Sequence, residues 1–202
     1  ASMALEFLCV PQAWFPDLPL DATVRVIMTA STSAQIHDTF WPELTRQYTT
    51  ARLPIGGRLM KSGFIEGSDR SLVTLSPDVP EAAHGKHAGA QFIIIDEAES
   101  LDEQFANAFE SCMTGNNEAM VLCYNPIRVT GYVATVVDRS PLFHPLRMSG
   151  LDHPNVVENR EIIPGAITRT YIRGKLLKEA RVPLSTPWEE VINRLEAGEW
   201  DN

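Results

Sequence analysis

An uninterrupted apolar run ends in two adjacent acids near the middle of the chain, at Phe92-Ile93-Ile94-Ile95-Asp96-Glu97. A short run of β-branched and aromatic residues without polar alternation is typical of a strand that is buried on both faces. Such strands occur almost only in parallel sheets covered by helices on both sides. The sequence therefore predicts an α/β fold with this strand near the centre of the sheet.

The remaining pattern alternates strand and helix, which favours a mostly parallel sheet flanked by helices. Further strands are predicted at 23–30, within the glycine-containing stretch 54–76, at 119–124 and at 142–148. Helices are predicted at 1–10, after the Ser31-Thr32-Ser33 cap with an interruption at Pro42, and at 101–113, 166–180 and 187–197. The alternation of strand and helix stops after residue 150, where Pro154, Pro164 and Gly165 precede two predicted helices. We therefore expect one domain over 1–150 and a linker with a helical extension over 151–202.

Composition narrows the class of protein. The 202 residues are 44% hydrophobic and 21% charged, which excludes a disordered chain and a collagen. The net charge of −9 argues against a protein that coats nucleic acid with a basic surface, although a small local patch stays compatible with DNA contact. No apolar run approaches the roughly 18 residues of a membrane span, so no membrane partner is expected.

The acids Asp96 and Glu97 carry the most specific chemistry. Ligands of open parallel sheets bind at the carboxyl ends of the strands, where these residues lie. This is the Walker B arrangement, in which Asp96 orients the shell of a Mg²⁺ ion through water and Glu97 polarises the water that attacks the γ-phosphate of ATP. The plain alternative is a strand end with two solvated acids.

A second polar position follows the next apolar strand, at Tyr124-Asn125-Pro126. The proline restricts the backbone of Asn125, and the amide falls at the carboxyl end of a strand adjacent to the acids. We interpret Asn125 as a residue that senses the γ-phosphate and passes the signal on. The plain alternative is an Asn-Pro turn.

Together these motifs resemble the ATPase domain of the large subunit of tailed-phage terminases. The resemblance covers roughly residues 1–180. It rests on the ordered set Ala30-Ser31-Thr32-Ser33-Ala34-Gln35-Ile36, Trp41-Pro42-Glu43-Leu44, Glu81-Ala82-Ala83-His84-Gly85-Lys86-His87-Ala88, Phe92-Ile93-Ile94-Ile95-Asp96-Glu97-Ala98 and Tyr124-Asn125-Pro126.

The resemblance implies a P-loop NTPase-like fold and a motor that couples hydrolysis of Mg-ATP to the translocation of double-stranded DNA into a procapsid. Asp96 and Glu97 would be its metal-site and catalytic residues, and Tyr124, Asn125 and Pro126 its coupling motif. The implied partners are the procapsid portal, the terminase small subunit and other copies in a homo-oligomeric ring. The implied location is the host cytoplasm, as a soluble phage protein.

Two departures from the family pattern qualify this expectation. The chain has no glycine-rich loop ending in Lys-Ser or Lys-Thr to hold phosphates, and Gly85-Lys86-His87 does not supply one. We therefore expect truncation before that loop, with Ala1 near the nucleotide site and little ATP hydrolysis by this chain alone. The scattered acids beyond residue 150 predict no nuclease activity. A basic residue acting in trans usually completes such motors; the candidates, each of which is otherwise a surface charge, are Arg58, Lys61, Arg70 and Lys86.

Two other functions remain open at this stage. One is a helicase-like ATPase of a different role, with the same acids and the same polar sensor. The other is a non-catalytic interaction domain whose nucleotide site has decayed.

Overall fold

The computed structural model describes residues 1–52, 55, 57–60, 63–66, 69–75, 87–101, 103–125, 130–137, 140–179, 183 and 185–197. The chain divides into two compact units, Ala1–Phe143 and His144–Asn202. Residues 81–86 of the quoted motif Glu81–Ala88 lie outside the described residues. No helix in the described ranges is long and apolar enough to cross a membrane.

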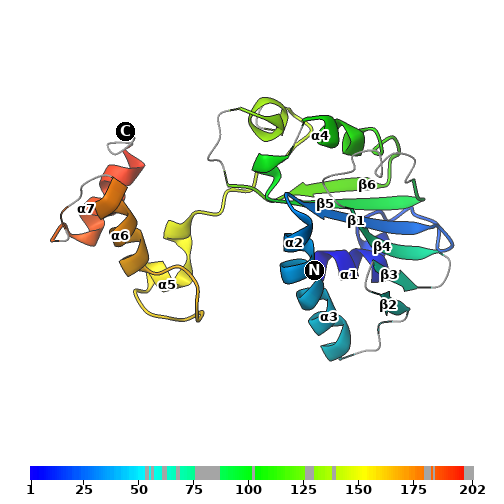
Figure 1. Cartoon of the computed structure of the whole chain (residues 1–202), viewed down its shortest axis with the longest axis horizontal. Coiled ribbons are helices and arrows are strands. Elements are labelled where there is room, and N and C mark those ends of the chain that lie inside the picture. The colour runs from blue at the N-terminus through cyan, green and yellow to red at the C-terminus, as the bar shows by residue number, and fades with distance from the viewer. Residues whose placement is uncertain are drawn as a thin grey trace. The chain divides into compact units, whose positions relative to one another are not determined.

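The first unit is built on one sheet whose order is β2-β3-β4-β1-β5-β6 (Figure 1). Its strands are β1 (Val24–Ala30), β2 (Arg58–Met60), β3 (Gly63–Glu66), β4 (Arg70–Thr74), β5 (Ala90–Asp96) and β6 (Glu118–Leu122). Strands β4, β1, β5 and β6 run parallel, whereas β2 and β3 add an antiparallel edge. This confirms the predicted α/β architecture with a mostly parallel sheet.

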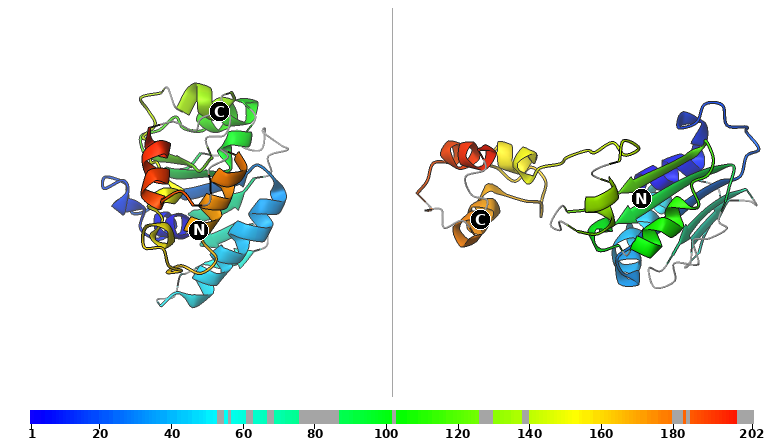
Figure 2. Two further views of the ribbon diagram at one scale, coloured as in Figure 1. Left: turned by 90° about the vertical axis from the view of Figure 1, so that its left-hand side faces the viewer. Right: turned by 90° about the horizontal axis from the view of Figure 1, so that it is seen from above.

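Helices cover both faces of this sheet, as Figures 1 and 2 show. The helices of the first unit are α1 (Ser2–Cys9), α2 (Ser33–Gln35), α3 (Trp41–Thr50) and α4 (Glu103–Glu110), with 3-10 helices η1 (Pro11–Ala13) and η4 (Ala98–Ser100) and π-helical turns η2 (Ile36–Phe40) and η5 (Val133–Val137). One hydrophobic cluster joins α1 and α3 to the sheet, and another joins α4 and η5 to its opposite face.

The alternation of side chains along the central strands explains the two clusters. Val26 and Phe92 point to the face covered by α1, whereas Ile27 and Ile93 point to the face covered by α4. All four side chains are fully buried. Because successive residues of a strand face opposite sides, a strand packed on both sides must be apolar at every position. The continuous apolar run of β5 therefore has the cause that the sequence predicted.

The predicted strand at 142–148 is wrong. These residues form no strand, and the side chains of Leu142, Leu146 and Met148 are 90%, 81% and 93% exposed. Pro141 and Pro145 have no N–H to donate to a strand ladder, and the segment spans the boundary between the two units. Apolar residues alone thus predicted a strand, but among the residues that the structure describes no strand pairs with this segment.

The helix predicted after Ser31-Thr32-Ser33 is present but contains a π-helical turn. The backbone N–H of Trp41 donates to the carbonyl of Ile36, five residues earlier, and α3 starts at Trp41 with Pro42 in its first turn. Proline cannot donate to the preceding turn, and its ring crowds the carbonyl four residues back. The wider turn at η2 lets the helical path continue through Pro42 without that clash.

The second unit contains α5 (Pro154–Val157), α6 (Arg169–Glu179) and α7 (Trp188–Glu196), preceded by the 3-10 helix η6 (Gly150–Asp152). Figure 2 shows these helices in yellow, orange and red. They enclose a small cluster around Val156, Trp188 and Val191. Arg169 ties the helices together, because it donates to the carbonyls of Val156 and Val157 and lies 5.1 Å from the centre of the Trp188 ring.

Asn155 organises the loop of the second unit. Its side chain is 1% exposed; Oδ1 accepts from the backbone N–H groups of Ile162 and Ile163, and Nδ2 donates to the carbonyl of Ile163, all at 2.8 Å. The Ile162 N–H also donates to the carbonyl of Arg160, and the Ile163 carbonyl also accepts from the Ala166 N–H. Replacing Asn155 by Ala removes its three hydrogen bonds and the Asn155 partner of the Ile163 N–H, so we expect a loss of about 2 kcal/mol in the free energy of unfolding of this unit.

Amide hydrogen exchange checks this expectation, because the Ile163 amide should lose its protection in the variant, whereas the Ile162 amide keeps the carbonyl of Arg160 as an acceptor. Asn193→Ala, at an exposed position of α7, serves as the control and should leave the exchange of both amides unchanged. Retained protection of Ile163 in Asn155→Ala would contradict the role of Asn155.

Candidate active site at the carboxyl edge of the sheet

Parallel pairing brings three strand ends together at one edge of the sheet. In the register of β1 and β5, Ala30 lies opposite Asp96. On the other side of β5, the N–H of Cys123 donates to the carbonyl of Ile95 at 2.9 Å, which extends the β6 pairing by one residue. Ser31, the acids and Cys123 therefore follow neighbouring strands at the same edge, where ligands of parallel sheets bind.

Glu97 adopts a backbone conformation that is uncommon for its residue type. Its φ of 51° and ψ of 45° lie in the left-handed region, which residues with a Cβ seldom occupy. The conformation turns the chain from β5 into η4, and the N–H of Ala98 donates to the carbonyl of Cys123 at 2.9 Å. Residues in unfavourable backbone conformations of this kind are frequent at functional sites, where contacts with the surrounding structure hold them in place.

The two carboxylates have different partners. Asp96 Oδ1 accepts from the backbone N–H of Glu97 at 3.1 Å, whereas Glu97 Oε2 lies 2.9 Å from the hydroxyl oxygen of Ser31. Both side chains are half-buried. The Glu97 carboxylate is thus held beside the end of β1, whereas the Asp96 carboxylate bonds to the backbone of its own turn.

The donor chemistry at Asp96 fits Mg²⁺. This ion prefers oxygen ligands and is usually held by one or two carboxylates, with waters and phosphate oxygens completing its shell. Within the described ranges, no group of three or more His, Cys, Asp or Glu side chains is placed to form an all-protein metal cage. A single carboxylate at a strand end matches the way Mg²⁺ binds with a nucleotide, and Asp96 would hold the ion through water.

The amino group of Ala1 lies at the same edge. Burial lowers its pKa, and the charges of Glu43, Cys123 and Asp96 act in the opposite direction. Burial, reinforced by the negative charge of Asp96, raises the pKa of the Cys123 thiol. The start of the chain is therefore close to the acids, as the sequence led us to expect for Ala1.

The predicted sensor residues follow β6 directly. The backbone N–H of Asn125 donates to Glu99 Oε2 at 3.4 Å, and Tyr124 packs against the cluster on the α4 face of the sheet. The side chain of Asn125 is exposed, while Pro126 lies outside the described residues. Asn125 and Glu97 thus follow the adjacent strands β6 and β5. The Glu97 carboxylate, however, contacts Ser31, which follows β1 on the other side of β5.

Of the four candidate basic residues, the structure describes Arg58 and Arg70, and both belong to the start of a strand. Arg70 begins β4 opposite Val24, at the other end of the strands, and donates to the carbonyls of Leu8 and Cys9 at the end of α1. Its guanidinium therefore caps α1 in this structure. Arg58 is exposed at the start of β2, and Lys61 and Lys86 lie outside the described residues.

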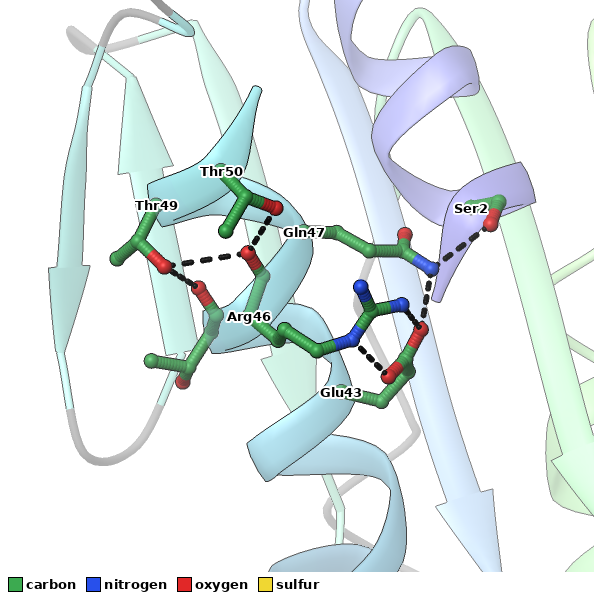
Figure 3. Close-up of polar contacts among 7 residues, drawn as sticks. Ser2, Glu43, Arg46, Gln47, Thr49 and Thr50 are labelled. Atoms are coloured by element: carbon green, nitrogen blue, oxygen red, sulfur yellow. Dashed lines mark hydrogen bonds and ion pairs between the residues drawn. The ribbon is translucent and has the colours of Figure 1, made fainter. Parts of the chain in front are cut away.

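A polar cluster on α3 joins this helix to α1 (Figure 3). Glu43 accepts from Arg46 Nε at 2.8 Å and Nη2 at 2.5 Å, and from Gln47 Nε2 at 2.7 Å. The same Gln47 nitrogen donates to the hydroxyl of Ser2 at 2.9 Å. Glu43 and Ser31 belong to motifs of the sequence but had no predicted role. The spacing of Thr32 and Gln35, which is that of a capping box, is the one sequence pattern that indicates a helix start next to Ser31.

The charge state of Glu43 gives a test of this cluster. Hydrogen bonds from Arg46 and Gln47 lower the pKa of Glu43 from 4.5 to about 2. A carboxyl group with a lowered pKa stabilises the fold above its unfolded-state pKa, and this contribution is lost as the pH falls through the folded-state value. We expect Arg46→Gln to move the pKa of Glu43 upward toward 4.5.

A carbon-detected NMR titration of the Glu43 carboxyl group between pH 6 and 2 measures this change. Arg160→Gln removes a comparable exposed ion pair, with Glu158, in the second unit and is the matched control. The control should leave the Glu43 titration unchanged. An unaltered midpoint in Arg46→Gln would show that Arg46 does not set the protonation of Glu43.

The fold and the edge geometry together define a class of protein: an α/β domain with a mostly parallel sheet and an acidic pair at the carboxyl end of the buried strand β5. No family model matches the chain. Over 118 residues, 54% of its length, the chain is 27% identical to a probable terminase large subunit of Enterobacteria phage P7. This match confirms the resemblance to terminase large subunits. It covers 24% of the phage P7 protein, so the chain corresponds to about a quarter of that relative.

Two solved structures are also similar to the chain, both of the large terminase from the thermophilic bacteriophage D6E. Crystal form 2 gives a TM-score of 0.47 at 10% identity and covers 65% of this chain and 32% of that chain. Crystal form 3, a complex with ADP, gives 0.44 at 12% identity and covers 66% and 32%. At these TM-scores the likeness adds nothing to the argument on function.

Proposed function

We propose that this chain forms part of the ATPase domain of a phage terminase large subunit, which couples hydrolysis of Mg-ATP to translocation of double-stranded DNA into a procapsid. One observation carries the proposal: Asp96 and Glu97 stand at the carboxyl end of a buried parallel strand, between the ends of β1 and β6. The similarity to the phage P7 protein supports the same function. The geometry of the site and the similarity to the phage P7 protein both support the proposal of a packaging ATPase.

In the proposed reaction each residue of the edge has one task. Asp96 would hold a hydrated Mg²⁺ ion, which when bound would supply positive charge to neutralise the phosphates. Glu97 accepts a hydrogen bond from the attacking water and so orients it toward the γ-phosphate. Asn125, at the end of the adjacent strand, responds to the loss of that phosphate. The match covers about a quarter of the phage P7 protein, so the activity is proposed for the full-length gene product.

The proposed partners follow from the same similarity. They are double-stranded DNA, the portal of the procapsid, the terminase small subunit and further copies of the large subunit in a ring, in the cytoplasm of the host. The net charge of −9 is compatible with a motor that grips DNA through few residues. Basic residues such as Arg58 would complete the site of a neighbouring copy.

Phosphate release by the full-length gene product, measured with Mg-ATP and with ATP plus EDTA, tests hydrolysis. Protection of DNA from nuclease in a procapsid packaging assay tests translocation. We expect Mg-dependent phosphate release and ATP-dependent protection. Phosphate release with strand separation and without packaging would identify a helicase-like ATPase instead, and the absence of any phosphate release would identify a non-catalytic domain.

A further inference from the structure

The hydroxyl of Ser31 lies between two acceptors. Its oxygen is 2.9 Å from Glu97 Oε2 and 2.7 Å from Gln35 Oε1. A serine hydroxyl has one proton, so it donates to only one of the two at a time. Hydrogen bonds to a charged carboxylate are stronger than those to a neutral amide, which favours Glu97 as the acceptor.

Gln35 is satisfied in either arrangement. It forms a capping box with Thr32, in which Gln35 Oε1 accepts from the Thr32 backbone N–H at 3.2 Å and the Gln35 N–H donates to Thr32 Oγ1 at 3.3 Å. When Ser31 donates to Glu97, Gln35 Oε1 therefore keeps the Thr32 donor. When Ser31 donates to Gln35, the Glu97 carboxylate loses its hydroxyl partner. The orientation of the Ser31 hydroxyl proton thus decides whether the Glu97 carboxylate has a hydrogen-bond donor at Ser31.

Gln35 also connects the orientation of the Ser31 hydroxyl to a longer helical segment. It lies in α2, which continues through η2 into α3, so the helical segment 33–50 is one path from the sheet edge to the Glu43–Gln47–Ser2 contacts with α1 (Figure 3). The π-helical turn η2 lies between the two ends. Such turns are frequent at functional sites, since they allow the helical register to change.

We propose that Ser31 is a positioning residue for Glu97, and that Gln35 is a competing acceptor through which the helical segment 33–50 regulates the orientation of the Glu97 carboxylate. This inference rests on the proposed function, because it assigns the regulation of the same site. Ser31 touches neither nucleotide nor water in this role; it acts by fixing the carboxylate that orients the water.

Steady-state ATP hydrolysis by the full-length gene product tests the inference with opposed variants. Ser31→Ala removes the donor, so kcat should fall about tenfold while KM stays within about twofold, as expected for one lost hydrogen bond to a charged group. Ser31→Thr retains a hydroxyl and should restore kcat. Gln35→Leu removes the competing acceptor, leaves the proton to Glu97 and should hold kcat at or above the native value.

Thr32→Ala is the matched control, because it weakens the same helix cap and keeps both Ser31 and Gln35. It should lower the melting temperature to an extent similar to Gln35→Leu and leave kcat unchanged. A double-mutant cycle of Ser31→Ala with Glu97→Ala, which removes the carboxylate partner altogether, followed by thermal unfolding without nucleotide, should show non-additive melting temperatures, since the two side chains interact directly.

The outcomes separate the two hypotheses. If the native protein releases no phosphate, the proposed function is overturned and this inference falls with it. If the native protein is active and Ser31→Ala has native kcat, only the role of Ser31 is overturned. If Gln35→Leu lowers kcat as Ser31→Ala does, Gln35 supports Ser31 instead of competing with Glu97, and the regulatory part is overturned.

Discussion

Replacement of Glu97 by Gln is expected to lower the rate of ATP hydrolysis by the full-length gene product by about 10²–10⁴-fold, the usual contribution of a general base. The amide preserves the size of the side chain and its contact with Ser31 but cannot accept a proton from the attacking water. ATP binding should persist, because Asp96 and not Glu97 is assigned to the metal. Phosphate release and equilibrium binding of a fluorescent ATP analogue measure the two effects separately.

Glu103→Gln is the matched control for this substitution. Glu103 is exposed in the first turn of α4, the helix that follows β5 in the chain. Its replacement by Gln removes one negative charge, as Glu97→Gln does. Its variant should hydrolyse ATP at the native rate. Hydrolysis that survives in Glu97→Gln at the level of Glu103→Gln would rule out the catalytic role proposed for Glu97.

Replacement of Leu72 by Ala is expected to cost about 3 kcal/mol of the free energy of unfolding of the first unit. Leu72 is fully buried in the centre of β4, pairs in register with Val26 and packs in the cluster beneath α1 and α3. Its truncation removes apolar contacts and leaves a cavity that strands paired on both sides cannot close. Urea denaturation followed by circular dichroism measures the loss.

Leu142→Ala makes the same chemical change at an exposed position. The Leu142 side chain is 90% exposed, so its variant should differ from the native protein by less than about 0.5 kcal/mol. The pair also tests the corrected description of residues 142–148. If this segment were a buried strand, Leu142→Ala would be as costly as Leu72→Ala.

Several features of the fold follow from local sequence alone. The apolar run of β5 had to be buried on both faces, so its parallel neighbours and covering helices could be expected before any coordinates. The position of Asp96 and Glu97 at a strand end followed from the same run, because the acids begin where the apolar residues stop. The cap at Thr32 was readable too, since the spacing of Thr32 and Gln35 satisfies reciprocal backbone donors at a helix start.

Other features depend on residues that are distant in the chain. The segment with Leu142, Leu146 and Met148 resembles a strand in composition, but a strand needs a neighbour to pair with, and the described strands all pair elsewhere. Arg70 resembled a free basic residue until the fold placed the carbonyls of Leu8 and Cys9 beside it. Sequence spacing contains no information on such encounters, because they are set by how the layers pack.

The amino-acid order of this protein was enough to establish a parallel α/β sheet with a pair of acids at a strand end, because periodicity and burial are properties of short segments. The contact of Glu97 with Ser31, 66 positions away, arose only when β1 and β5 paired in register and brought their ends to one edge. Hydrogen bonds act over about 3 Å, so partners of this kind are chosen by the folded arrangement and not by any local pattern.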